Sequence, residues 1–164
     1  MKATEYIHMA LENGKGWTMG LINDMKDAPL TAPTPNGGNH PLWVLGHIVR
    51  AESDLLDGFI LGQPNRFPDL EQFSMGAEPT SNADDYPTMD ELLGKFEEIR
   101  SATLAHLATL SDEDLGKKSH APEEFGATFG TVGACFAAMQ THMAFHTGQV
   151  ADARRAAGRK PLMA

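Results

Sequence analysis

Cysteine and basic residues are scarce in this sequence, and long apolar runs are missing. Cys135 is the single cysteine, so no disulfide can form within the chain, a usage that fits the reducing cytoplasm. No stretch approaches the ~20 apolar residues that a membrane-spanning helix needs. The first residues also lack the apolar core of a signal peptide. We therefore expect a soluble cytoplasmic protein without a membrane partner.

Positive charge is also in short supply. Acidic residues outnumber basic ones by 22 to 13, and the formal net charge is −9. Nucleic-acid-binding proteins usually carry a basic patch or a basic overall balance, so we expect no nucleic-acid partner. One dense basic cluster lies near the C-terminus and suits the last turn of a helix, where the helix dipole favours cations; a phosphate site is the alternative. Its members are Arg154, Arg155, Arg159 and Lys160.

Alternating strand patterns of useful length are missing as well, whereas four segments have the apolar periodicity of helices. These segments are residues 4–25, 41–61, 88–110 and 131–157. The 164 residues make up one domain's worth of chain. The sequence therefore predicts a single all-α domain over residues 1–164, built as a four-helix bundle.

Turn-forming residues separate these helices. Residues 28–39 are rich in proline, glycine and asparagine, and Asn39 or His40 is the expected N-cap of the second helix, ahead of Pro41. Thr88 and Glu91 form the capping-box pattern at the start of the third helix. The connection 62–87 contains four prolines and is long enough to cross the bundle.

Two helix faces have a composition that indicates what they contact. Small residues notch the first helix and would admit a close neighbouring helix or a partner subunit; they are Gly14, Gly16 and Gly20. Acidic residues on the second helix are typical of a solvated face; they are Glu52, Asp54 and Asp57.

The most informative residues are histidines. His142 and His146 are four residues apart, which places both rings on one face of the fourth helix, one turn from each other. Imidazoles in this arrangement can bind one metal ion together. The spacing alone also arises by chance, but both histidines lie on the apolar stripe, where a buried ring is costly unless its nitrogens find partners.

A third histidine, His47, lies on the apolar stripe of the second helix. Helical rise allows His47 to reach the level of His142 and His146 whether the two helices run parallel or antiparallel. Three neutral imidazoles leave coordination positions open on a divalent ion, which is the layout of a catalytic site rather than a closed structural one. Zinc, nickel, copper and iron all suit such ligands.

Two motifs resemble those of the DinB-like superfamily, the YfiT-type metal-binding bundles. The first is Trp43-Val-Leu-Gly-His47-Ile in the second helix, and the second is His142-Met-Ala-Phe-His146-Thr-Gly-Gln149-Val in the fourth. The resemblance implies an up-down-down-up bundle with a long crossover between helices two and three. It also implies that His47, His142 and His146 are the ligands of a divalent metal ion, zinc or nickel above all. Dimers are common in the superfamily, so a homodimer is a possible assembly.

Neighbours of the three histidines have expected roles too. Gln149 shares their face and could orient a ligand histidine or hold a bound water, or simply be a satisfied polar residue. Trp43 is expected to fill the core or form a wall of the pocket. His40 is a cap, a rim residue or a reserve ligand. Cys135 lies about 10 Å along the helix from His142, too far to ligate, and is expected to be a buried inert thiol.

Three functional hypotheses follow. In the first, the resemblance implies an enzyme that activates a low-molecular-weight thiol, such as bacillithiol or mycothiol, or water, as an S-transferase or hydrolase acting on a small molecule. In the second, the protein is a non-catalytic metal-binding or small-ligand-binding module in a stress response. In the third, it is a purely structural bundle without a metal.

Overall fold

The computed structural model describes residues 1–32, 34 and 37–162. Its α-helices are α1 (Ala3–Asn23), α2 (Pro41–Ser53), α3 (Met89–Leu107), α4 (Gly126–Phe129) and α5 (Val132–Ala156). Within the described residues there is no strand, only an isolated bridge between Lys118 and Thr131. The predicted all-helical class is confirmed. No helix in this part of the chain is long and apolar enough to span a membrane.

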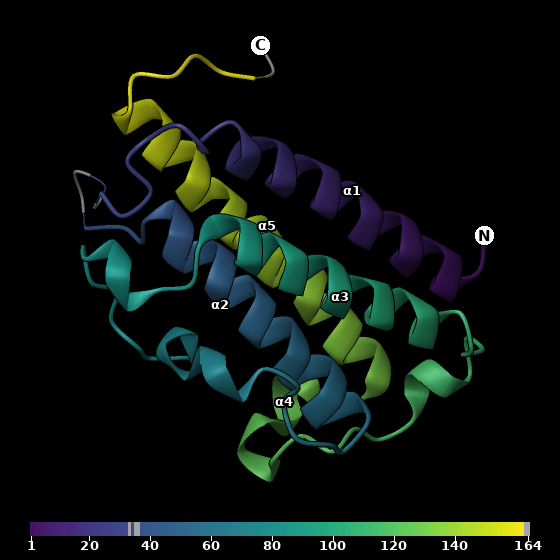
Figure 1. Cartoon of the computed structure of the whole chain (residues 1–164). Coiled ribbons are helices and arrows are strands. Elements are labelled where there is room, and N and C mark those ends of the chain that lie inside the picture. Colours follow the sequence, from purple (N-terminus) through teal and green to yellow (C-terminus); the bar gives the residue numbers. More distant parts are fainter. Residues whose placement is uncertain (33, 35–36, 163–164) are drawn as a thin grey trace.

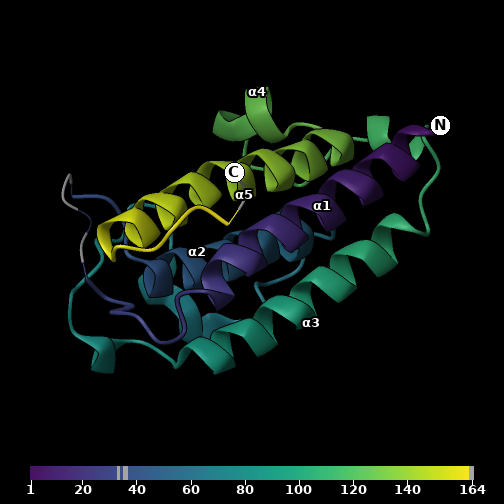
Figure 2. The same ribbon diagram turned by 90° about the horizontal axis from the view of Figure 1, so that it is seen from above.

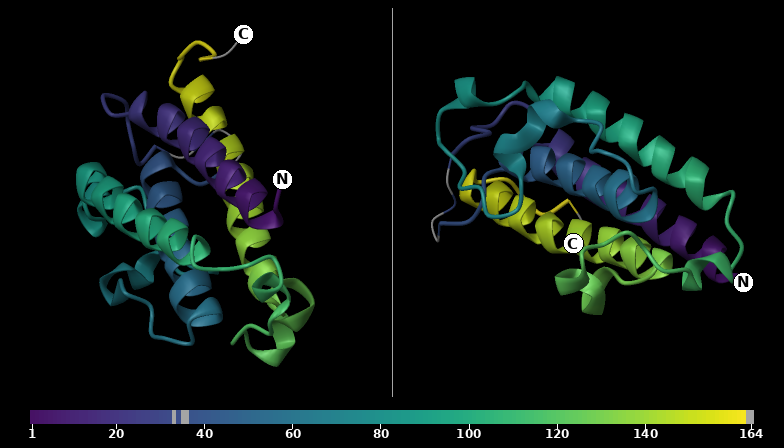
Figure 3. Two further views of the ribbon diagram at one scale, coloured as in Figure 1. Left: turned by 90° about the vertical axis from the view of Figure 1, so that its right-hand side faces the viewer. Right: turned by 90° about the horizontal axis from the view of Figure 1, so that it is seen from below.

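The long helices pack along one another (Figures 1 and 2). α2 and α3 begin at one end of the molecule, and α1 and α5 begin at the other, as the views in Figure 3 also show. α1 lies beside α5, where the hydroxyl oxygens of Thr18 and Thr147 are 2.6 Å apart. α2 contacts both α3 and α5. α2 and α5 run in opposite directions. Their middle turns face each other, since His47 of α2 contacts His142 of α5.

Local sequence signals explain where the helices begin. The His40 ring caps α2 by accepting a hydrogen bond from the backbone N–H of Trp43. Thr88 and Glu91 form the predicted capping box of α3. The predicted second helix is longer than α2 itself, because the chain continues from Ser53 as the π-helical segment η1 (Asp54–Ile60).

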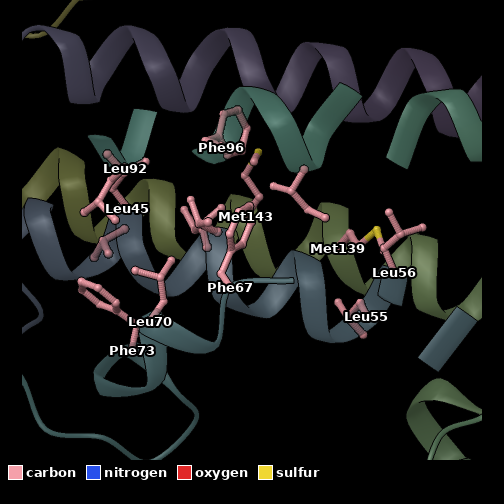
Figure 4. Packing of buried hydrophobic residues seen from close by; sticks show 14 of the residues in the cluster. Leu45, Leu55, Leu56, Phe67, Leu70, Phe73, Leu92, Phe96, Met139 and Met143 are labelled. Carbon is pink, nitrogen blue, oxygen red and sulfur yellow. The ribbon is translucent and has the colours of Figure 1, made fainter. Parts of the chain in front are cut away.

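The long connection is more ordered than its prolines suggest. It contains the 3₁₀ segments η2 (Pro68–Phe73) and η3 (Ala83–Asp85). Figure 4 shows Leu70 and Phe73 near Leu45 of α2 and Phe67 farther along the bundle. All three side chains belong to the buried core. A side chain at Gly46 would overlap the Phe73 ring, so this glycine lets η2 lie directly on α2. The connection 116–130 likewise contains η5 (Glu123–Phe125) before α4.

The expectation of a solvated acidic face on the second helix was wrong for two of its three residues. Glu52 is 4% exposed, and Asp57 is also buried. Arg100 of α3 donates to both carboxylate oxygens of Glu52 at 2.8 and 2.7 Å, and it is itself buried. Asp57 accepts hydrogen bonds from Arg66 and Ser53. Buried carboxylates need such partners, and here the guanidinium partners come from outside the helix.

The basic cluster at the C-terminus consists largely of paired side chains. Arg154 is buried and donates to a carboxylate oxygen of Asp24 at 2.9 and 2.7 Å. Arg159 pairs with Asp24 and Asp27, and Arg155 pairs with Asp152. The pairs of Arg154 and Arg159 with Asp24 and Asp27 link the ends of α1 and α5, whereas Arg155 and Asp152 lie on the same helix. They favour the interpretation as a helix terminus over a phosphate site, because the guanidinium groups already have carboxylate partners.

Candidate metal centre

Three imidazole rings meet where α2 crosses α5. His47 comes from α2, and His142 and His146 come from successive turns of α5. The Nε2 atom of His142 lies 3.0 Å from Nε2 of His47 and 3.1 Å from Nε2 of His146. One ligand nitrogen from each ring lies within 4.8 Å of the other two. The structure thus brings together the three histidines that the sequence singled out.

The rings are buried and neutral. His47 and His146 are 8% and 5% exposed, and His142 is half-buried. Burial lowers the pKa of the His47 and His146 imidazoles below the usual 6.5. For His142, burial first and the neighbouring His146 and His47 rings next lower the pKa to about 3. All three rings are therefore neutral at neutral pH, the form in which an imidazole can ligate a metal through its unprotonated nitrogen.

Hydrogen bonds to the outer ring nitrogens fix two of the tautomers. Nδ1–H of His47 donates to the backbone carbonyl of Phe73 at 2.7 Å, and a carbonyl can only accept. Nδ1–H of His146 donates to Oε1 of Gln149, also at 2.7 Å. The rings of His47 and His146 therefore both carry their proton on Nδ1. The Nε2 lone pairs of His47 and His146 both point at Nε2 of His142.

This donor set fits a metal ion. A proton on Nε2 of His142 can lie along only one of the two short Nε2–Nε2 contacts at a time, so the neutral rings alone leave one contact between lone pairs. A divalent cation satisfies all three. Nitrogen ligands at Zn–N distances of about 2.0–2.1 Å in a tetrahedral arrangement are roughly 3.3–3.4 Å apart. The separations of His142 Nε2 from Nε2 of His47 and of His146, 3.0 and 3.1 Å, are close to that value.

The two predicted neighbours contact the histidines directly. Gln149 accepts the His146 proton, as described above. The indole ring of Trp43 stacks on the His47 ring, with centroids 4.6 Å apart and planes 13° from parallel. Trp43 is 4% exposed, so it shields one face of His47 from water and also belongs to the core. Its Nε1 is buried and has no hydrogen-bond partner among the described residues.

The accessible side of the site is formed by α5. His142 is the least buried of the three rings, and Phe145 beside it is 67% exposed. The Phe145 ring contacts His146 edge-on, with centroids 5.2 Å apart. On the other side of the site, Trp43 stacks on the His47 ring and the Phe73 carbonyl accepts its Nδ1–H.

The remaining candidates lie outside the cluster. His40 is fully engaged, since its Nδ1 caps α2 and its Nε2–H donates to the carbonyl of Thr80 at 2.8 Å. The reserve ligand is therefore a structural residue. Cys135 is buried, and burial raises the pKa of its thiol to about 11. Its Sγ–H donates to the carbonyl of Phe129.

The comparison with family models is decisive for ancestry. A model described as the DinB superfamily matches residues 10–150, a span that contains α2, α3, most of α5 and all three histidines. The chain belongs to the DinB superfamily. No curated protein matched it. In this member of the superfamily, the two histidine motifs lie on helices that the fold brings into contact.

Two contacts of this DinB-superfamily site escaped the sequence analysis. The carbonyl of Phe73 is a backbone group in the long connection, and no side-chain pattern marks it. Asn39 was considered only as a helix cap, yet its Nδ2–H donates to Oε1 of Gln149 at 3.3 Å. The sequence feature that could have indicated this contact is the position of Asn39 shortly before the motif that contains His47.

Proposed function

We propose that this protein binds one divalent transition metal ion, zinc or nickel, through Nε2 of His47, His142 and His146. The observation that carries the proposal is the convergence of these nitrogens at 3.0 and 3.1 Å, with the two outer rings held as Nδ1–H tautomers. In both outer rings the Nδ1–H group is hydrogen-bonded, which leaves the Nε2 lone pair facing the centre of the cluster. Histidines that met by chance would not be expected to share this arrangement.

We propose further that the site is catalytic and acts on a low-molecular-weight thiol or water together with a small electrophile. A bound divalent ion supplies Lewis acidity that lowers the pKa of water or a thiol toward neutrality. The protein's own residues orient the ligands: Phe73 and Gln149 fix two rings, and Trp43 excludes water from one face of His47. The half-buried His142 leaves the substrate side accessible.

The bond changes of the thiol reaction balance without an oxidant or reductant. The S–H proton passes to solvent, the sulfur lone pair forms a C–S bond with the electrophilic carbon, and the leaving group departs with its electron pair. Cys135 does not supply the sulfur, because its thiol is buried and has a raised pKa. The nucleophile therefore comes from a second small molecule.

Turnover by metal-loaded protein tests the catalytic proposal. Zinc- and nickel-loaded protein is screened with a panel of small thiols and a chromogenic alkyl halide. We expect thiol-dependent release of halide that His142→Ala abolishes and that His8→Ala, an exposed histidine outside the cluster, leaves intact. Metal and thiol binding without turnover across the panel would instead support the non-catalytic module.

We also propose that the four long helices form one up-down-down-up domain and that the protein is a cytoplasmic homodimer. The helix directions in Figure 1 support the up-down-down-up topology. The free thiol of Cys135 supports the cytoplasmic location. The homodimer proposal rests on exposed aromatic side chains and open glycine positions of α1 and α5. Trp17 of α1 and Phe145 of α5 are 64% and 67% exposed. A Cβ built at Gly16, Gly20 or Gly148 meets nothing within 4 Å.

A further inference from the structure

Asn39 is half-buried and lies immediately before the cap of α2. Both of its chain neighbours are held in place. Gly38 donates its N–H to the hydroxyl of Thr34 at 2.7 Å, and the ring of His40 binds both the start of α2 and the carbonyl of Thr80. Hydrogen bonds therefore hold the residues on both sides of Asn39.

The Asn39 amide is the outer end of a hydrogen-bonded chain that leads to the metal centre. Its Nδ2–H donates to Oε1 of Gln149, and the same oxygen accepts Nδ1–H of His146. Two donors on one atom require that atom to be the oxygen of the Gln149 amide, because the amide nitrogen accepts no hydrogen bond. The Asn39 N–H₂ group thus bonds the Gln149 amide in the orientation that turns its oxygen toward His146.

The orientation of that amide decides the tautomer of His146. With the oxygen toward the ring, Nδ1 carries the proton and Nε2 presents its lone pair to the other histidines. With the amide rotated by half a turn, its N–H₂ group would face Nδ1, the proton would move to Nε2, and the ring could no longer ligate through that atom.

We propose that Asn39 is a positioning residue of the metal site, which acts through Gln149 to hold His146 in the metal-binding tautomer. This inference rests on the proposed function for its consequence in metal affinity, but not for its consequence in the tautomer. A residue outside the ligand set, contributed by the segment before α2, thereby controls one of the three ligands.

Asn39→Asp separates this proposal from simple electrostatics. Aspartate has nearly the same shape but can only accept, so it would bind the Gln149 N–H₂ group and turn the oxygen away from His146. If Asn39 controls the His146 tautomer, Asn39→Asp should bind the metal more weakly. The added negative charge by itself would predict tighter binding of a cation, so the two explanations differ in sign.

The first measurement is the ring ¹⁵N spectrum of His146 in metal-free, full-length protein. We expect the Nδ1–H form in the wild type, the Nε2–H form in Asn39→Asp, and a mixture in Asn39→Leu, which can bond neither way. Gln149→Glu, whose carboxylate can only accept, should keep the Nδ1–H form. This measurement needs no bound metal, so it decides the role of Asn39 even if the proposed function fails.

The second measurement is the zinc affinity of the same variants by chelator competition. We expect Asn39→Asp to bind zinc about 10–100-fold more weakly than the wild type, the usual range for partners of metal-ligating histidines. Asn39→Leu should lie between the two. Ser81→Asp is the matched control, because Ser81 lines the same groove as Asn39, whereas the side-chain hydrogen bonds of Gln149 among the described residues go to Asn39 and His146. A wild-type tautomer and affinity in both Asn39 variants, or tighter zinc binding by Asn39→Asp, would overturn the proposal.

Discussion

Nδ1 of His47 lies 2.7 Å from the carbonyl oxygen of Phe73. This hydrogen bond ties a ring of the metal centre to η2 in the long connection, although the two residues are 26 positions apart. The connection therefore does more than cross the bundle. It supplies the group that sets the tautomer of one ligand, and the Phe73 side chain simultaneously packs in the core.

Gly46→Ala tests this link without touching a ligand. A methyl group at Gly46 would overlap the Phe73 ring and push η2 away from α2. We expect a loss of about 1–3 kcal/mol in the free energy of unfolding, as for other overpacked cores, and weaker zinc binding because His47 loses its carbonyl partner. Urea unfolding and chelator competition measure the two effects. Gly58→Ala, where the new methyl group meets no neighbour within 4 Å, should show neither.

The buried pair of Glu52 and Arg100 makes a second prediction. Arg100 also donates to the carbonyl of Leu11, and Thr103 donates to Glu52, so the pair joins three helices. Removing one partner by Arg100→Met leaves a buried carboxylate without its counter-charge. We expect a loss of about 3–5 kcal/mol in urea unfolding. Replacing both residues, as Glu52→Leu with Arg100→Met, should recover much of it; a double variant as unstable as the single one would contradict this account.

Cys135 should react slowly with thiol reagents in the native protein. At pH 8 a thiol with a pKa of about 11 is roughly 0.1% thiolate, whereas an exposed cysteine with a pKa of about 8.5 is roughly a quarter thiolate. Labelling with a disulfide reagent should therefore be at least a hundredfold slower in buffer than in urea. Equal rates would show that the thiol is accessible and would reopen it as a nucleophile.

The homodimer proposal predicts the effect of filling a surface notch. Gly16→Leu adds a side chain where the chain itself offers no contact, so the fold should tolerate it, but a close second copy would be displaced. We expect the wild type to sediment as a dimer at micromolar concentration and Gly16→Leu to sediment as a monomer. Gly94→Leu on α3, another glycine facing open space, is the control. A monomeric wild type would contradict the proposal.

The sequence predicted what depends on local patterns. Helix periodicity, the caps at His40 and Thr88, and the histidines of the apolar stripes are all visible within a few turns of chain. Partners from distant segments were not visible. Glu52 looked solvated because Arg100 lies 48 residues away, and nothing in the composition of η2 shows that its last carbonyl faces His47. Long-range pairing is decided by tertiary packing, which single-sequence patterns do not encode.

The metal content of the protein tests the central claim most directly. Protein purified without a histidine tag is analysed by elemental mass spectrometry after loading and desalting. Three converging imidazoles predict about one zinc or nickel ion per chain in the wild type, and a large loss in His47→Ala while His8→Ala retains the metal. A metal content well below one ion per chain in the wild type, unchanged in His47→Ala, would contradict the account.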